Sequence, residues 1–215
     1  MPNNFRDLTL NEISSKYQYV LWDTCAISEC YFHKNKEDGS TEEKVDYVSN
    51  LIKFKNNLEK MILNGGNFYI TPGVYNELFE VKPYNLKKSV KAHPMGRVDE
   101  FTKLWRAFRK DIKAHKRLAS TFQESGKILD VNNLGIPYFQ LFEQDYSFLK
   151  NQFNLSEVDF KILETAATLS KRTISSAIIS NDTKLWDAYS LFMIREKKNY
   201  SWIGFFKRMG FDNFC

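Results

Sequence analysis

Three short apolar runs, each followed by a polar residue and a helical pattern, constrain the fold of this chain more than any other feature. They cover residues 17–22, 68–70 and 174–180, and they are rich in the β-branched and aromatic side chains that strands favour. Strands that alternate with helices are typical of a parallel sheet with helices on both faces. The sequence therefore predicts an α/β protein, a three-layer α/β/α sandwich with a central parallel sheet.

Helical patterns account for most of the remaining chain. Apolar residues recur at steps of three and four, the period of an amphipathic helix, and the expected helices cover residues 45–63, 97–120 and 138–149. Polar, glycine-containing stretches at 33–44 and 132–139 are predicted to be exposed loops. Residues 81–150 lengthen the chain between the strand–helix units, so we expect a helical insertion within one domain that spans residues 1–215.

The composition favours one well-packed domain. The 215 residues are 43% hydrophobic, which is enough for a single core at this length. No stretch approaches the roughly 20 uninterrupted apolar residues that a membrane span needs. The first residues also lack the basic-then-apolar pattern of a secretory signal. We therefore expect a cytoplasmic protein that does not enter a membrane.

Cysteine and histidine give no pattern typical of a metal site or of a Ser-His-Asp triad. There are three of each, without the spacing of zinc ligands and far apart in the case of the histidines. The odd number of cysteines favours a reducing compartment. These residues are Cys25, Cys30, Cys215, His33, His93 and His115.

Four acidic residues fall where predicted strands end or where the next helices begin. Asp23 ends the first strand, and Glu77 lies early in the helix after the second. Asp159 is in the first turn of the helix that leads to the last strand, and Asp182 follows that strand. In a parallel sheet the strand carboxyl ends and the helix amino ends share one edge, where ligands usually bind. The topology therefore predicts that the four carboxylates meet at that edge.

Carboxylates gathered in one crevice repel one another, so we expect a cation among them. One or two Mg²⁺ or Mn²⁺ ions suit a set of oxygen ligands best. Such ions bind and polarise a phosphodiester and supply a hydroxide-like nucleophile. The pattern thus favours metal-dependent hydrolysis of a nucleic-acid backbone.

Each of these acids also has a simpler interpretation. Asp23 and Asp182 are suitable helix N-caps, and Glu77 suits a solvated helix surface. Ser156 and Asp159 have the spacing of a capping box. Their joint position on the edge that bears ligands is what favours the site over independent caps.

The same residues resemble the four motifs of the PIN-domain family, whose members are metal-dependent nucleases with a parallel α/β/α sandwich. The first motif is similar to YVLWDTCAIS and falls on Asp23, and the second is similar to FYITPGVYNEL and falls on Glu77. The third and fourth are similar to LSEVDFKILETAATLS and AIISNDTKLW, and they fall on Asp159 and Asp182. Residues 81–150 lie outside the resemblance.

This resemblance implies an endoribonuclease that hydrolyses RNA with Mg²⁺ or Mn²⁺. Asp23, Asp159 and Asp182 would be the inner metal ligands. Glu77 would bind metal directly or through water. The supporting polar groups would be Thr24, Ser180 and Asn181.

The resemblance leaves the biological role open. It allows the toxin of a toxin–antitoxin pair, with an antitoxin or another protein as partner, as well as a homodimer and DNA as substrate. The main alternative is a catalytically weak module of the same fold that binds nucleic acid or protein. A phosphatase of the Asp-x-Asp type is disfavoured, because Cys25 stands where the second Asp would be needed.

Basic residues recur along the helix expected at 97–120 and form a stripe beside the apolar one. A phosphate backbone lying along them would give salt-dependent binding without sequence preference. The alternative is an ordinary solvated face, since Asp99, Glu100 and Asp111 lie nearby in the sequence. The basic residues are Lys103, Arg106, Lys110, Lys113 and Arg117.

The segment SWIGFFKRMGF at 201–211 combines four aromatic residues with two basic ones. Such a segment could stack bases or bind a protein partner. Core packing of a last strand or helix is the interpretation that we favour.

Overall fold

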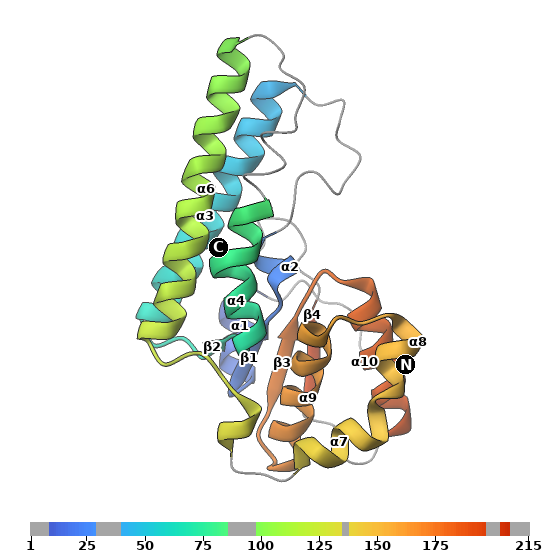
Figure 1. Cartoon of the computed structure of the whole chain (residues 1–215). Coiled ribbons are helices and arrows are strands. Elements are labelled where there is room, and N and C mark those ends of the chain that lie inside the picture. The colour runs from blue at the N-terminus through green and yellow to red at the C-terminus, as the bar shows by residue number, and fades with distance from the viewer. Residues whose placement is uncertain (1–8, 29–39, 86–97, 135–137, 197–202, 207–215) are drawn as a thin grey trace.

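The computed structural model describes residues 9–28, 40–85, 98–134, 138–196 and 203–206. Its centre is a four-stranded sheet in the order β2-β1-β3-β4, and every pair of neighbours is parallel (Figure 1). The predicted strands are present but shorter than expected, and a fourth strand comes from the C-terminal segment. The strands are β1 (Tyr19–Trp22), β2 (Phe68–Tyr69), β3 (Ser176–Ile179) and β4 (Ile203–Phe206).

Helices cover the sheet on both sides, which confirms the predicted three-layer α/β/α sandwich (Figure 1). Those before the insertion are α1 (Leu10–Lys16), α2 (Thr24–Ile27), α3 (Thr41–Leu63), α4 (Pro72–Asn76) and the π-helical turn η2 (Glu77–Val81). Those that begin within it are α6 (Val98–Glu124), the 3₁₀ turn η3 (Val131–Leu134), α7 (Tyr138–Tyr146) and α8 (Phe148–Phe153). The last are α9 (Glu157–Lys171) and α10 (Thr183–Arg195). Within the described ranges, none of these helices has the length and apolar character that crossing a membrane requires.

The start of α3 corrects one prediction. The helix begins at Thr41 rather than at residue 45, so the last part of the expected loop at 33–44 is helical. Ser40 and Glu43 form a capping box: the Ser40 hydroxyl accepts from Glu43 N–H at 3.2 Å, and the Glu43 carboxylate accepts from Ser40 N–H at 2.9 Å. These bonds satisfy backbone donors that a helix start leaves unpaired, which explains the earlier beginning.

The insertion also differs from its predicted boundaries. The helix expected at 97–120 continues to Glu124, and Gly126 then adopts a left-handed φ of +64°. The helix expected at 138–149 is two helices, α7 and α8, and α8 ends at Asn154 with a left-handed φ of +49°. Part of the loop expected at 132–139 is ordered as η3, and α7 begins within its last residues.

Helices α3 and α6 lie side by side and extend beyond the sheet as an arm (Figure 1). The base of this α3–α6 arm shares the main core, through residues such as Phe54 and Phe122. Farther out, Val48, Phe108 and their neighbours form a second, smaller apolar cluster. The two helices are therefore held together by apolar contacts that do not depend on the sheet.

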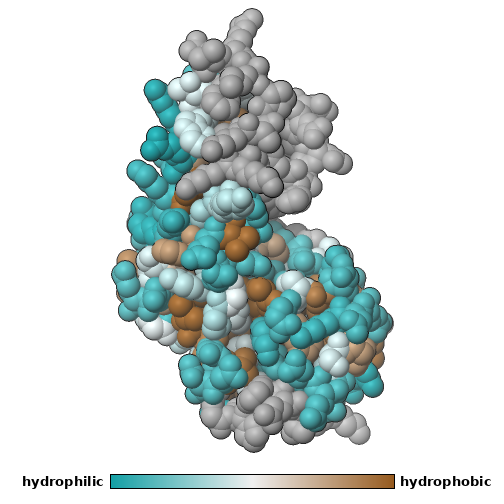
Figure 2. All heavy atoms as spheres, viewed as in Figure 1, coloured by the Kyte–Doolittle hydropathy of each residue, from teal (hydrophilic) through white to brown (hydrophobic). Residues whose placement is uncertain are grey.

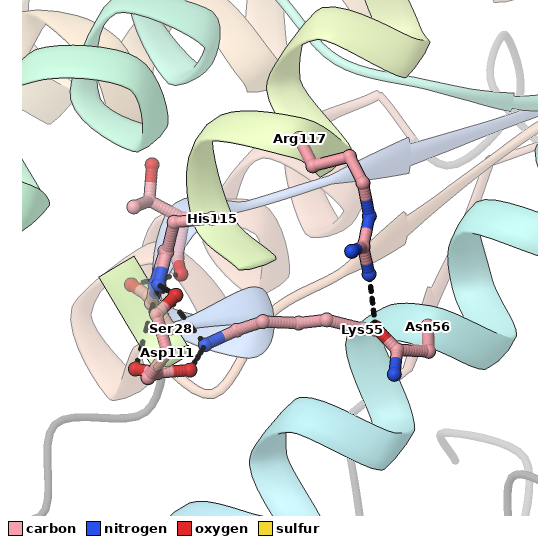
Figure 3. A network of polar contacts seen from close by, with 7 residues as sticks. Ser28, Lys55, Asn56, Asp111, His115 and Arg117 are labelled. Atoms are coloured by element: carbon pink, nitrogen blue, oxygen red, sulfur yellow. Dashed lines mark hydrogen bonds and ion pairs between the residues drawn. The ribbon is translucent and has the colours of Figure 1, made fainter. Parts of the chain in front are cut away.

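A buried polar cluster joins the same two helices (Figure 3). Lys55 of α3 lies 2.5 Å from the Asp111 carboxylate and 3.1 Å from His115 Nδ1, both on α6. All three side chains are almost fully buried. Burial, followed by the Lys55 charge, lowers the pKa of His115 to about 4, so the imidazole is neutral. Its Nδ1 lies within hydrogen-bond distance of both Lys55 Nζ and the Asp111 carbonyl oxygen, at 3.1 and 3.0 Å. His33 and His93 lie outside the described residues.

The described part of the C-terminal aromatic segment is packed in the core, as favoured above. Phe205 is buried, and its ring meets those of Trp186 and Tyr189 at centroid distances of 5.0 and 5.1 Å. Phe206 makes an edge contact with Tyr17. Trp202 and residues 207–211 lie outside the described residues, so base stacking by them stays untested.

Candidate functional site

Asp23 lies at the carboxyl end of β1 and begins α2 as its N-cap. Its side chain is buried, with a relative exposure of 3% for the residue. One carboxylate oxygen, Oδ2, accepts a hydrogen bond from the Cys25 thiol and another from the Ser180 hydroxyl, each at 2.6 Å. A buried carboxylate at the end of a central strand is thus fixed by two neutral donors.

The pairing of β1 with β3 brings Ser180 and Asp182 next to Asp23. Trp22 lies opposite Ile179 in the register, so the residues that follow the two strands are neighbours. Ser180 donates to Asp23 and accepts from Asp182 N–H at 2.9 Å. Asp182 itself caps α10 and accepts from Lys184 N–H at 2.6 Å. The hydroxyl of Ser180 therefore links the chain segments that carry the first and the fourth predicted acid.

Asp159 lies in the first turn of α9, where it forms the predicted capping box with Ser156. Glu77 stands at the junction of α4 and η2, and α4 starts as predicted with Thr71 as N-cap and Pro72 in its first turn. The two helices approach closely: a Cβ on Gly73 of α4 would lie 2.9 Å from a methyl group of Val158. This contact brings α4, which leads to Glu77, against the first turn of α9.

The pKa values of Asp23 and Asp159 are raised mainly by burial and further by the charges of neighbouring acids. Burial raises the pKa of Asp23 to about 6, the hydrogen bonds from Cys25 and Ser180 oppose this, and the Asp159 charge adds to it. Burial also raises the pKa of Asp159, and the charges of Asp182 and Glu77 raise it further. Asp159 therefore interacts electrostatically with each of the other three acids. An acidic group at one edge of the sheet is the arrangement that the topology predicts.

The four acids do not surround a common point at which one metal ion would sit. Among the described residues, no three Asp, Glu, His or Cys side chains lie close enough to hold one metal ion as they stand. Asp23, Asp159 and Asp182 also serve as helix-capping residues, so the simpler interpretation applies to them as well. Capping holds these carboxylates near helix amino ends and is compatible with a second role.

Cys25 is a neighbour of the site that the sequence interpretation used only to disfavour a phosphatase. Its sulfur donates to Asp23, lies 3.3 Å from the Ser180 hydroxyl and accepts from Asn181 N–H at 3.1 Å. Burial and then the Asp23 charge raise the pKa of the Cys25 thiol, so it is protonated and acts as a donor. Its position two residues after a strand-ending Asp is the signal that could have identified it.

The polar residues predicted to support the site have different surroundings. Ser180 bonds to Asp23 directly, whereas Asn181 contacts Cys25 through its backbone. Thr24 is buried, and its hydroxyl has no hydrogen-bond partner in the described part of the chain. Ser180 is therefore the supporting group with the clearest structural role.

The predicted basic stripe lies on α6, which is distant in sequence from most of the carboxylates. Helix α6 contacts η2, the turn that begins with Glu77. Lys116 of α6 lies over the ring of Phe79, two residues after Glu77, with Nζ 4.9 Å from the ring centroid. Every member of the stripe is exposed. The stripe consists of Lys103, Arg106, Lys110, Lys113 and Arg117.

The raised pKa of Asp23 predicts a pH-dependent stability. A folded-state pKa of about 6, above the ordinary 3.8, means that the folded protein holds this proton more tightly than the unfolded chain. The stability from the neutral form is complete below about pH 4 and is lost as the pH rises to 6, by on the order of 3 kcal/mol. Urea denaturation with a chelator should show the wild type losing this amount relative to Asp23→Asn between pH 4 and 7. A difference that does not change with pH would contradict the prediction.

Comparisons with protein-family models, with curated proteins and with solved structures find no match to this chain. The similarity to the PIN-domain motifs therefore stays a prediction from the four sequence segments.

Proposed function

We propose that this protein is a PIN-type, metal-dependent nuclease that hydrolyses phosphodiester bonds of RNA. The observation that carries the proposal is that Asp23 and Asp182 follow neighbouring parallel strands and are linked through the Ser180 hydroxyl. In addition, the charge of Asp159 raises the pKa of Asp23, and the charges of Asp182 and Glu77 raise the pKa of Asp159. Like charges near a buried carboxylate are unfavourable without a cation, and Asp23 is buried while the other three acids are partly buried. A divalent cation at this place would relieve the repulsion, so the acidic group supports a metal-dependent activity.

The donor set suits Mg²⁺ or Mn²⁺, because all four groups offer carboxylate oxygens. Asp23, Asp159 and Asp182 would hold one or two ions, and Glu77 would bind directly or through water. A bound cation would offset the repulsion among these carboxylates, which supports a metal at this edge of the sheet. When bound, the metal would polarise the phosphodiester and lower the pKa of its bound water.

The remaining groups of the site would orient the carboxylates. Ser180 and Cys25 both donate to the Oδ2 atom of Asp23, so they fix its plane and leave Oδ1 less engaged. The Asp182 carboxylate is held by two backbone N–H groups of α10. Fixed ligands lose little conformational freedom when an ion binds, which favours binding.

Cleavage assays test this function directly. We expect the protein to convert single-stranded RNA to shorter products with Mg²⁺ or Mn²⁺ and to give none with a chelator. A parallel incubation with DNA of the same sequence would define the substrate class. A binding module of the same fold would instead retain RNA in a salt-sensitive manner without metal-dependent products, and that result would refute the nuclease proposal.

A further inference from the structure

The outer face of α6 carries only positive charge over most of its length. From Thr102 to Gln123 the one acidic residue is Asp111, which is buried against Lys55 and so does not reach this face. Asp111 therefore does not offset the stripe, although its place in the sequence implied that it would. Two exposed residues, Arg109 and Lys116, extend the stripe. We call the full set the basic face: Lys103, Arg106, Arg109, Lys110, Lys113, Lys116 and Arg117.

Most charges of the basic face have no partner among the residues that the structure describes. Arg117 bonds to Glu59 and Asn56 of α3, and Lys116 lies over Phe79. The other five make no hydrogen bond or ion pair with any described residue. The neighbouring helix is different, because the exposed part of α3 mixes Glu42, Glu43 and Asp46 with its lysines. The excess of positive charge is thus confined to one helix of the arm.

The basic face is long enough to contact several phosphates of a nucleic-acid strand, and one end of it lies near the turn that carries Glu77. From Lys103 to Arg117 it runs for about 21 Å along the helix axis, at about 1.5 Å per residue. Near its inner end, Lys116 lies over Phe79 of η2, the turn that begins with Glu77. Hydrophilic residues follow the edge of the arm formed by α6 (Figure 2).

We propose that the basic face binds the phosphate backbone of single-stranded RNA and leads it toward the four acids. The second part of this inference rests on the proposed nuclease function. A membrane surface fits less well, because the exposed large apolar residues of the described chain are Leu63, Val81, Tyr84 and Ile194, and none is on α6. A row of unpaired charges on a rigid helix matches a chain of phosphates, and binding would be independent of sequence.

The test measures binding without cleavage. A labelled single-stranded RNA of about 20 nucleotides is titrated by fluorescence anisotropy with a chelator present, at several salt concentrations. Each phosphate contact contributes roughly 0.7 to the slope of log affinity against log salt for single strands. Arg106→Gln with Lys110→Gln should therefore flatten the slope by about 1.4 and weaken binding roughly 10- to 30-fold near 0.1 M salt.

A matched control removes the same charge from the adjacent helix. Lys53→Gln with Lys60→Gln changes two exposed lysines of α3 and should alter the affinity less than twofold. Equal losses in both double variants, or an unchanged slope in the α6 variant, would overturn the inference. Displacement of RNA by poly-glutamate at equal charge concentration would also overturn it, because an acidic protein would then fit the face as well.

Failure of this inference and failure of the nuclease proposal give different results. Metal-dependent cleavage with unaltered binding by the α6 variant would reject the basic face and leave the nuclease in place. Salt-dependent binding that the α6 variant loses, without metal-dependent products, would support the RNA-binding face and reject the hydrolytic function.

Discussion

Asp23→Asn is expected to reduce metal-dependent RNA cleavage by roughly 1,000-fold, equivalent to about 4 kcal/mol of transition-state stabilisation. Asp23 is the most buried of the four acids and has the central position in the site, at the end of β1. The amide is close to the carboxylate in size and can keep a hydrogen bond from Ser180. It removes the negative charge that a divalent cation requires. The loss should therefore appear in catalysis and metal binding rather than in folding.

Two measurements separate loss of the site from loss of the protein. Titration calorimetry with Mn²⁺ should give heat for the wild type and almost none for Asp23→Asn. Denaturation should show that the variant is folded at pH 7, because it no longer has to ionise a buried carboxyl group. Asp46→Asn, an exposed change on α3, is the matched control and should keep full activity. If Asp23→Asn cleaves RNA at the wild-type rate, the proposed catalytic role of Asp23 is wrong.

The parts of the site that follow from local sequence signals were predictable. A β-branched run that ends in Asp gives β1 and the cap of α2, and Ser156 with Asp159 gives the start of α9. Strands that alternate with helices then require a parallel sheet, so the edge shared by Asp23 and Asp182 follows without coordinates. The start of α3 also has a local signal, because Ser40 and Glu43 have the spacing of a capping box. The loop predicted at 33–44 did not take this spacing into account.

The parts that depend on packing between distant segments were not predictable from patterns. Nothing near Lys55 in the sequence indicates that its ammonium group is buried, because the partner Asp111 is 56 residues away. The same pairing determines the charge of the outer face of α6, since it removes Asp111 from the surface. The Cys25 thiol contacts Asp23 locally, whereas its approach to Ser180, the residue that follows β3, joins positions 155 residues apart. Periodicity in the sequence shows which face of a helix is buried, but not which residues of a distant segment pack against that face.

Asp111→Leu is expected to destabilise the folded protein by about 3–5 kcal/mol, the largest effect on stability that we predict. The change leaves the ammonium group of Lys55 buried between α3 and α6 without its carboxylate, and a buried charge that loses its partner is highly unfavourable. Urea denaturation at pH 7 should show a lower midpoint with little change in slope. A loss below about 1 kcal/mol would mean that Lys55 escapes to water or gives up its proton.

A double variant distinguishes this cause from poor packing of the new leucine. Adding Lys55→Met to Asp111→Leu replaces both charges by apolar groups, and we expect most of the lost stability to return. Arg117→Gln provides the exposed counterpart, because it breaks the pair with Glu59 between the same two helices. Arg117 is half exposed, so this pair is worth about 0–1 kcal/mol. If the double variant stays as unstable as Asp111→Leu, steric strain rather than the unpaired charge is responsible, and the cluster does not hold the arm together electrostatically.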